Sequence, residues 1–251
     1  MRGLHVQSGV SMSLLSSIAA LVLAVQAAPA PPPPVTKPPS LDERMTPQLQ
    51  AAAQAVRMHQ PQAALDILAP VLAAYEADHA QETRRIYCGM SLQETLLYGM
   101  MAAKDKVGAV MLPPGYCTAL YLKGYALVDL GRIAEAKPIY ERLLTLAPMY
   151  AQYQTEYGQL LRLEKDWPRM LAICTKASEA AAIADPAIKP MQQGAALRCQ
   201  GYALTELHRY AEAEQRYRDA LAINPNDAKA QNELGYIAQQ RAKAPASTPT
   251  S

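Results

Sequence analysis

The chain has 251 residues, a length that suits one large domain or two small ones. Half of its residues are hydrophobic and only 18% are charged, which excludes a chain that is disordered throughout. The 24 basic and 22 acidic side chains give a formal net charge of +2, too even a balance for a general polyanion-binding surface.

The first residues predict an export signal over 1–27. Arg2 precedes the apolar stretch Met12–Ala28, and small residues such as Ala27 end it at a suitable cleavage site for signal peptidase. The apolar run is roughly 16 residues, shorter than the ~20 that span a bilayer. We therefore expect a mature chain without a membrane span, although retention as an uncleaved anchor stays open.

Two segments are not expected to form a hydrophobic core. Residues 28–40 are rich in proline, which removes a hydrogen-bond donor and fixes φ, so we expect an extended, disordered linker. Residues 242–251 are small and polar and contain proline, and we expect a disordered tail. The folded part should therefore run from about 41 to 241.

Residues 41–116 predict degenerate or irregular helical repeats. Thr46 followed by Pro47 suits the start of a helix. Gln60-Pro61 suits a turn, and apolar residues at helical spacing then predict a second helix over 62–78.

The least regular stretch is 82–116. Ser91-Leu92-Gln93-Glu94 is a capping box, which predicts a helix from there to about Lys106. The following residues, 107–116, are too rich in glycine and proline to stay helical.

A repeat follows. Glycine recurs at Gly124, Gly158, Gly201 and Gly235, with spacings of 34, 43 and 34 residues. Segments 122–148 and 199–225 share GYAL, a turn, AEA, a tyrosine and a closing proline. This pattern resembles the tetratricopeptide repeat, a helix–turn–helix unit that stacks into a solenoid. The resemblance implies an all-α, tetratricopeptide-like solenoid with units 117–150, 151–193 and 194–227 and a C-terminal capping helix over 228–241.

Within such units, small residues allow the two helices to cross closely, a glycine forms the turn, a tyrosine fills the gap and proline ends the unit. The middle unit departs from this pattern, with Lys165 in the turn and Met170 and Cys174 at packing positions. Its extra residues, around 181–190, should extend the second helix and then form a loop. The expected repeat-packing residues are Gly124, Gly131, Ala136, Tyr140, Pro148, Gly158, Gly201, Ala213, Tyr217, Pro225 and Gly235.

The four cysteines, Cys88, Cys117, Cys174 and Cys199, allow three disulfide connectivities. Pairing Cys88 with Cys117 and Cys174 with Cys199 would close loops of 29 and 25 residues. Four buried free thiols remain the alternative. The chain has no CxxC and no Cys/His cluster at ligand spacing, so we expect no metal site.

No catalytic motif stands out. The four histidines are isolated, and the sequence contains no GxSxG, no HExxH and no glycine-rich phosphate loop. We therefore expect no cofactor, no catalytic residue and no enzymatic activity. A nucleic-acid surface would need a cluster of Lys and Arg that the sequence lacks.

In the tetratricopeptide family, the first helix of each unit lines the concave side of the superhelix. Carried over to this chain, the inward positions combine aromatic rings, amides and two guanidinium groups, which suit an extended peptide and a carboxylate. The expected peptide-binding groove consists of Tyr121, Tyr125, Gln159, Arg162, Arg198, Tyr202, Asn232 and Tyr236. The alternative is that these tyrosines only pack one helix on the next.

These features predict a periplasmic scaffold that binds a partner protein or peptide, in the manner of exported bacterial proteins that assist envelope assembly. Two alternatives remain. An enzyme or enzyme accessory would have its site in the irregular region 84–117, and a purely structural scaffold would keep its N-terminal anchor.

Overall fold

The computed structural model describes residues 38–243. Contacts divide the chain into Met1–Pro38 and Pro39–Ser251, and the structure described below belongs to the second of these units. The expected signal over 1–27 lies outside the described residues. So do most of the expected linker over 28–40 and most of the expected tail over 242–251.

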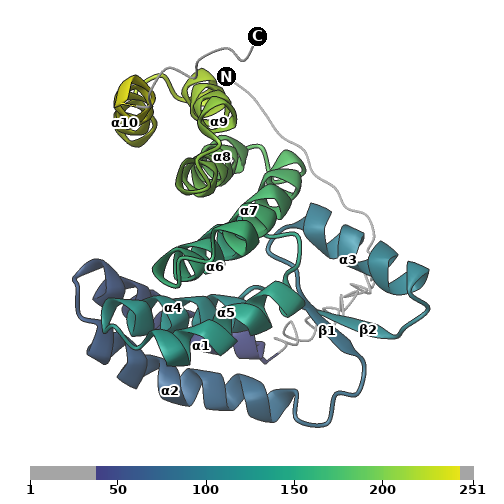
Figure 1. Ribbon diagram of the computed structural model, residues 1–251. Coiled ribbons are helices and arrows are strands. Elements are labelled where there is room, and N and C mark those ends of the chain that lie inside the picture. Colours follow the sequence, from purple (N-terminus) through teal and green to yellow (C-terminus); the bar gives the residue numbers. More distant parts are fainter. Residues whose placement is uncertain (1–37, 244–251) are drawn as a thin grey trace, which may run out of the picture. The chain divides into compact units, whose positions relative to one another are not determined.

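The described residues form an all-α solenoid with a small inserted sheet, which confirms the fold class (Figure 1). Each hairpin consists of two antiparallel helices joined by a short turn. The hairpins are α1 (Leu41–Arg57) with α2 (Pro61–Asp78), α4 (Gly115–Asp129) with α5 (Ile133–Leu146), α6 (Ala151–Leu163) with α7 (Trp167–Ala182) and α8 (Lys189–Glu206) with α9 (Tyr210–Ile223), followed by the single helix α10 (Ala228–Lys243).

Successive hairpins stack through apolar clusters, the main one extending from α1 to α8 and a second one joining α8, α9 and α10. The helices contribute large, fully buried side chains such as Leu68, Leu127, Leu143 and Leu160. A single hairpin buries only part of its apolar surface, so each one is stabilised by its neighbours. The stack therefore holds the first helices of successive hairpins side by side.

The irregular stretch forms a β–α–β insert, and its strands were not predicted. Strands β1 (Arg85–Cys88) and β2 (Ala109–Leu112) pair in parallel, with Arg85 opposite Ala109 and Cys88 opposite Leu112. Helix α3 (Leu92–Lys104) is the crossover that a parallel pair requires. The Ser91 side chain caps α3 as expected. Helices α1 and α2 pack directly on α4, so the insert does not interrupt the stack.

Helix α1 begins earlier than predicted, and Thr46 is not its cap. Ser40 is the N-cap and forms a capping box with Glu43. The Thr46 hydroxyl instead donates to the Asp42 carbonyl at 2.7 Å, and Pro47 lies inside the helix. The earlier start places Asp42 where its carboxylate accepts from Tyr75 Oη at 2.8 Å and from the backbone N–H of Gly115 at 3.1 Å. This contact joins α1, α2 and α4.

The additional residues of the middle unit are shared between two helices and a loop. Helix α7 continues to Ala182, and α8 already begins at Lys189, with Pro190 in its first turn. Proline is tolerated at this position because the N–H groups of the first turn have no partner within the helix. The result is a longer first helix, α8, in the fourth hairpin.

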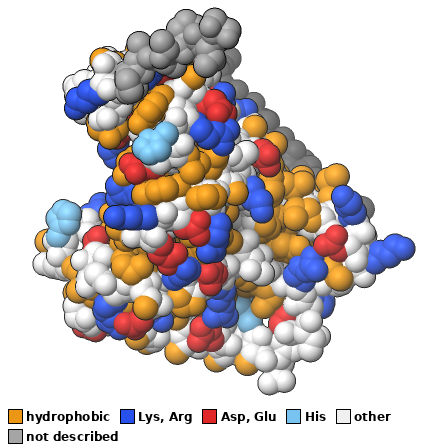
Figure 2. Space-filling model, viewed as in Figure 1, with side chains coloured by type: hydrophobic (Ala, Val, Ile, Leu, Met, Phe, Trp, Pro, Cys, Tyr) orange, Lys and Arg blue, Asp and Glu red, His pale blue; other side chains and the backbone are white. Residues whose placement is uncertain are grey.

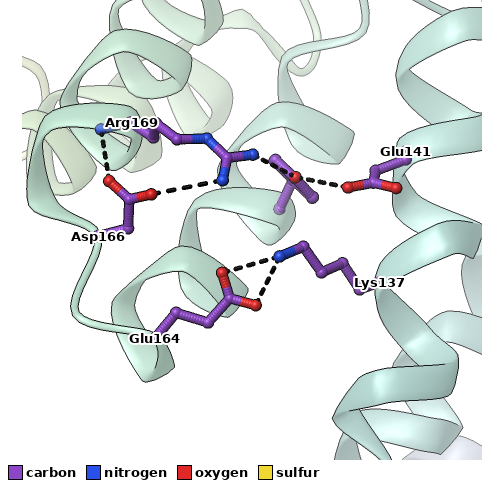
Figure 3. A network of polar contacts seen from close by, with 6 residues as sticks. Lys137, Glu141, Glu164, Asp166 and Arg169 are labelled. Carbon is purple, nitrogen blue, oxygen red and sulfur yellow. Dashed lines mark hydrogen bonds and ion pairs between the residues drawn. The ribbon is translucent and has the colours of Figure 1, made fainter.

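Polar side chains connect α5, α6 and α7 on the surface (Figure 3). Lys137 Nζ lies 2.6 Å from Glu164 Oε1, which ties α5 to the end of α6. Tyr157 Oη donates to Glu141 at 2.9 Å and accepts from Arg169 at 3.2 Å. Exposed ion pairs are each worth at most about 1 kcal/mol, so this network fixes the register of neighbouring helices more than it stabilises the fold.

Candidate functional site

Close contacts of glycine with tyrosine set the spacing within two hairpins. A Cβ on Gly124 would lie 2.9 Å from Cε2 of Tyr140, and a Cβ on Gly201 would lie 2.7 Å from Cζ of Tyr217. Both tyrosines are almost completely buried. Glycine is therefore required where the ring of the second helix meets the first helix.

The middle hairpin replaces the ring with a disulfide bond. A Cβ on Gly158 would lie 2.9 Å from Sγ of Cys199 and 3.1 Å from Sγ of Cys174. Cys174 follows Gly158 by the same number of residues as Tyr140 follows Gly124. The bonded sulfurs thus fill the volume that a tyrosine ring fills in the neighbouring hairpins.

Each disulfide joins a cysteine to the next cysteine along the chain. Cys88 of β1 is bonded to Cys117 of α4, and Cys174 of α7 is bonded to Cys199 of α8. The first bond ties the insert to the solenoid, and the second ties one hairpin to the next. None of the four thiols is free, so the alternative of buried free thiols is wrong.

The remaining expected packing residues divide into two groups. Ala136 and Ala213 are completely buried, and Gly131 adopts φ +71° in the turn between α4 and α5. Pro148 and Pro225 follow the ends of α5 and α9. Gly235 differs from this group, because a Cβ placed there would have no neighbour within 4 Å. It belongs to α10, on which no later helix of residues 38–243 packs.

A groove of about 640 Å³ runs along the first helices of successive hairpins. Its lining comes from α4, α6, α8, α9 and α10. Six of the eight predicted groove residues line it, namely Tyr125, Gln159, Arg162, Arg198, Tyr202 and Asn232.

Two predicted groove residues do not line the groove. Tyr121 packs between other tyrosine rings, 5.5 Å from Tyr153 and 6.4 Å from Tyr140 by ring centroids. Its hydroxyl accepts from Gln152 at 2.8 Å and donates to Glu156 at 3.3 Å. Tyr236 is 46% exposed on α10. Tyr121 therefore supports the groove from below, whereas Tyr236 lies outside it.

The two arginines of the groove differ. Arg198 forms an ion pair with Asp227, whose carboxylate also accepts from the backbone N–H of Ala230 and so caps α10. The Arg198 guanidinium therefore already has an acidic partner, whereas the sequence suggested that it would bind a ligand carboxylate. Arg162 stacks over the ring of Tyr202 at 5.5 Å, an arrangement in which the positive charge meets the face of an aromatic ring.

Two carboxylates in the groove were not predicted. Burial raises the pKa of Glu156, and a hydrogen bond from Tyr121 partly offsets this rise. Burial and the nearby charge of Glu206 raise the pKa of Glu233, which Arg162 partly offsets. Both glutamates hold the sixth position of their units, counted from Ala151 and Ala228. This repeat of position is the signal that could have indicated them.

Elsewhere the described surface carries both charges. Figure 2 shows acidic and basic side chains interspersed over the face in view. Between residues 38 and 243, no three His, Cys, Asp or Glu side chains come together as a metal ion would need. No described helix combines the length and the apolar character needed to cross a bilayer.

Comparison with known proteins agrees with this architecture. Residues 118–149 match the family model of the tetratricopeptide repeat. The chain is a tetratricopeptide-type solenoid. The matched residues contain nearly all of α4 and all of α5. No curated protein sequence matches the chain at a significant level.

Solved structures with TM-scores above 0.5 share the fold. Tetratricopeptide-like repeats of a putative kinesin light chain from Podosopora anserina are 14% identical, with a TM-score of 0.54, over 82% of this chain and 91% of that chain. MamA from Desulfovibrio magneticus RS-1 is 17% identical, with a TM-score of 0.52, over 81% of this chain and 88% of that one. The first tetratricopeptide domain of Spaghetti (RPAP3), bound to an HSP90 peptide, is 23% identical, with a TM-score of 0.44, over 50% and 93%.

Proposed function

We propose that this protein is a non-enzymatic scaffold that binds an extended segment of a partner protein in its groove. The observation that supports this most is the continuity of the groove across α6, α8 and α10. A rounded small-molecule pocket would converge on one point, whereas this surface follows the direction in which the hairpins stack. That direction suits a chain lying across several helices.

The chemistry of the groove also suits a peptide. Tyr125 and Tyr202 are half-buried, so they offer ring faces that cost little conformational entropy on binding. The side-chain amides of Gln159 and Asn232 form no hydrogen bond with any described residue, and each amide can both donate and accept. A peptide backbone presents alternating N–H and C=O groups, which such amides can satisfy.

We propose that the protein acts in the bacterial periplasm and that its partner belongs to an envelope complex. Two disulfides join all four cysteines, and such bonds persist in oxidising compartments and are rare in the cytosol. The apolar stretch Met12–Ala28 has the features of an export signal. Mass spectrometry of the protein isolated from its cell should find blocked thiols and a start after about residue 27. A Met1 start with four free thiols would contradict the location.

Partner capture tests the binding function. The mature protein, immobilised in a periplasmic extract, should retain one or a few proteins, and the double variant Tyr125→Ala with Tyr202→Ala should release them. Tyr236→Ala is the matched control, because this tyrosine is exposed on α10 outside the groove. Thermal unfolding of each variant shows whether it is folded. Unchanged retention by a folded double variant would contradict the proposed groove.

A further inference from the structure

The groove is lined by two carboxylates and three cations, namely Glu156, Glu233, Arg162, Arg198 and Lys229. Arg198 forms an ion pair with Asp227, and the charge of Arg162 partly offsets the raised pKa of Glu233. Glu156 forms no ion pair with any residue of the described region, and its one hydrogen bond comes from Tyr121. A half-buried carboxylate thus lines the groove without an ion-pair partner among the described residues.

Aromatic rings surround this carboxylate. Tyr125 lines the same groove, and Tyr121 Oη lies 3.3 Å from Glu156 Oε1. The ring of Tyr121 lies 6.3 Å from that of Tyr125 and 6.4 Å from that of Tyr140, measured between ring centroids. Burial raises the pKa of all three phenols, and the negative charge of Glu156 raises the pKa of each of them further. The faces of such rings attract a cation, and so does the carboxylate. Their combined preference is for a positively charged group.

We propose that Glu156 gives the groove its specificity by binding a lysine or arginine side chain of the bound segment, next to the ring of Tyr125. This inference rests on the proposed scaffold function and narrows the class of partner to segments that carry a basic residue. An acidic side chain at this place would meet a like charge. An aliphatic one would remove water from Glu156 without supplying a donor.

A lysine or arginine side chain supplies what the site lacks. Its N–H groups form charge-assisted hydrogen bonds with the free lone pairs of the carboxylate, and its methylene stem can lie along the tyrosine ring. The hydrogen bond from Tyr121 holds the carboxylate in place before binding, so little order is lost on association.

The experiment uses the mature protein with its disulfides intact and four pools of labelled peptides. Each pool is an N-acetylated, C-amidated heptapeptide mixture with a fixed central residue, which is Lys, Arg, Glu or norleucine, between randomised uncharged positions. Binding is measured by fluorescence anisotropy at physiological salt, where weak long-range attraction is screened. The Lys or Arg pool should bind at least about tenfold more tightly than the Glu and norleucine pools, the equivalent of one well-formed charged contact.

Variants assign the preference to one residue. Glu156→Gln keeps the shape and can still accept from Tyr121, yet it should remove most of the preference for the basic pools. Glu156→Asp keeps the charge and should retain part of the preference for the basic pools. Glu179→Gln is the matched control, because it makes the same change of net charge at an exposed site on α7, away from the groove.

The outcomes separate this inference from the proposed function. Binding that the Tyr125→Ala and Tyr202→Ala double variant abolishes, but that shows no basic preference, would overturn the role of Glu156 and leave the scaffold intact. The same holds for a basic preference that survives Glu156→Gln. If none of the four pools binds the wild-type protein, both proposals are contradicted.

Discussion

Glycines at equivalent positions of the hairpins face very different surroundings. Gly201 lies against the buried ring of Tyr217, whereas a Cβ on Gly235 would meet nothing within 4 Å. Gly201→Ala should therefore force the ring or the helix to move and lower the free energy of unfolding by about 1–3 kcal/mol. Gly235→Ala should instead raise it by up to about 1 kcal/mol through helix propensity. Urea unfolding of both variants measures the difference, and equal effects would contradict the packing described here.

The turns within hairpins share one residue with positive φ, which is glycine only once. Gly131 has φ +71°, and Lys165 has φ +58° at the equivalent turn between α6 and α7. A side chain in this region costs roughly 1–2 kcal/mol, although added glycine also increases the entropy of the unfolded chain. Lys165→Gly should therefore stabilise the protein by up to about 1 kcal/mol, and Gly131→Ala should destabilise it by about as much. Thermal unfolding that showed the opposite signs would contradict this account of the turns.

At the scale of elements, the β–α–β insert contains a buried carboxyl group. Glu94 is 2% exposed in the first turn of α3 and accepts from the backbone N–H of Met90 at 3.3 Å. Its charge also raises the pKa of Tyr150 and Tyr153. Burial raises its pKa from 4.5 to about 7. The folded protein therefore favours the protonated form.

This shift predicts how stability depends on pH. Below pH 4.5 the carboxyl is protonated in both the folded and the unfolded chain, so burial of the group carries no ionisation penalty. As the pH rises through 7, the folded state must bury a charge, and up to about 3 kcal/mol of stability is lost. Urea unfolding between pH 5 and 8 measures this loss. Glu94→Gln should flatten the profile, whereas Glu179→Gln should not, and a steep profile in both variants would show that other groups cause it.

At the scale of the whole molecule, the disulfide between Cys174 and Cys199 both joins two hairpins and shapes the groove, which Cys199 lines. Replacing both residues by alanine removes the cross-link and leaves Gly158 without its packing partners. We expect a loss of about 2–4 kcal/mol in unfolding free energy, together with weaker peptide binding. The same double change at Cys88 and Cys117 is the control. It should lower stability but leave binding unchanged, because neither residue lines the groove.

Part of the groove could be predicted because the repeat fixes where each helix turns its side chains. Gln159 and Asn232 lie on equivalent faces of α6 and α10, and both line the groove as the register requires. Tyr236 has the register position of Tyr202 but lies outside the groove, since the described part of the chain has no hairpin after α10. Glu156 was missed because a lone glutamate on a helix resembles solvated surface until its neighbours are known.

The sequence by itself determined the helical units, the capped start of α3, the turn at Gly131 and the interval of the repeat. The interval of the repeat is read by comparing segments 34 or more residues apart. The other features depend on residues within a few positions of one another, where capping, backbone conformation and helical periodicity act. Only the tertiary structure decided the β1–β2 pair, the burial of Glu94 and the unpaired charge of Glu156. Each of these depends on contacts between segments distant in the chain, and those contacts form only once the hairpins have stacked.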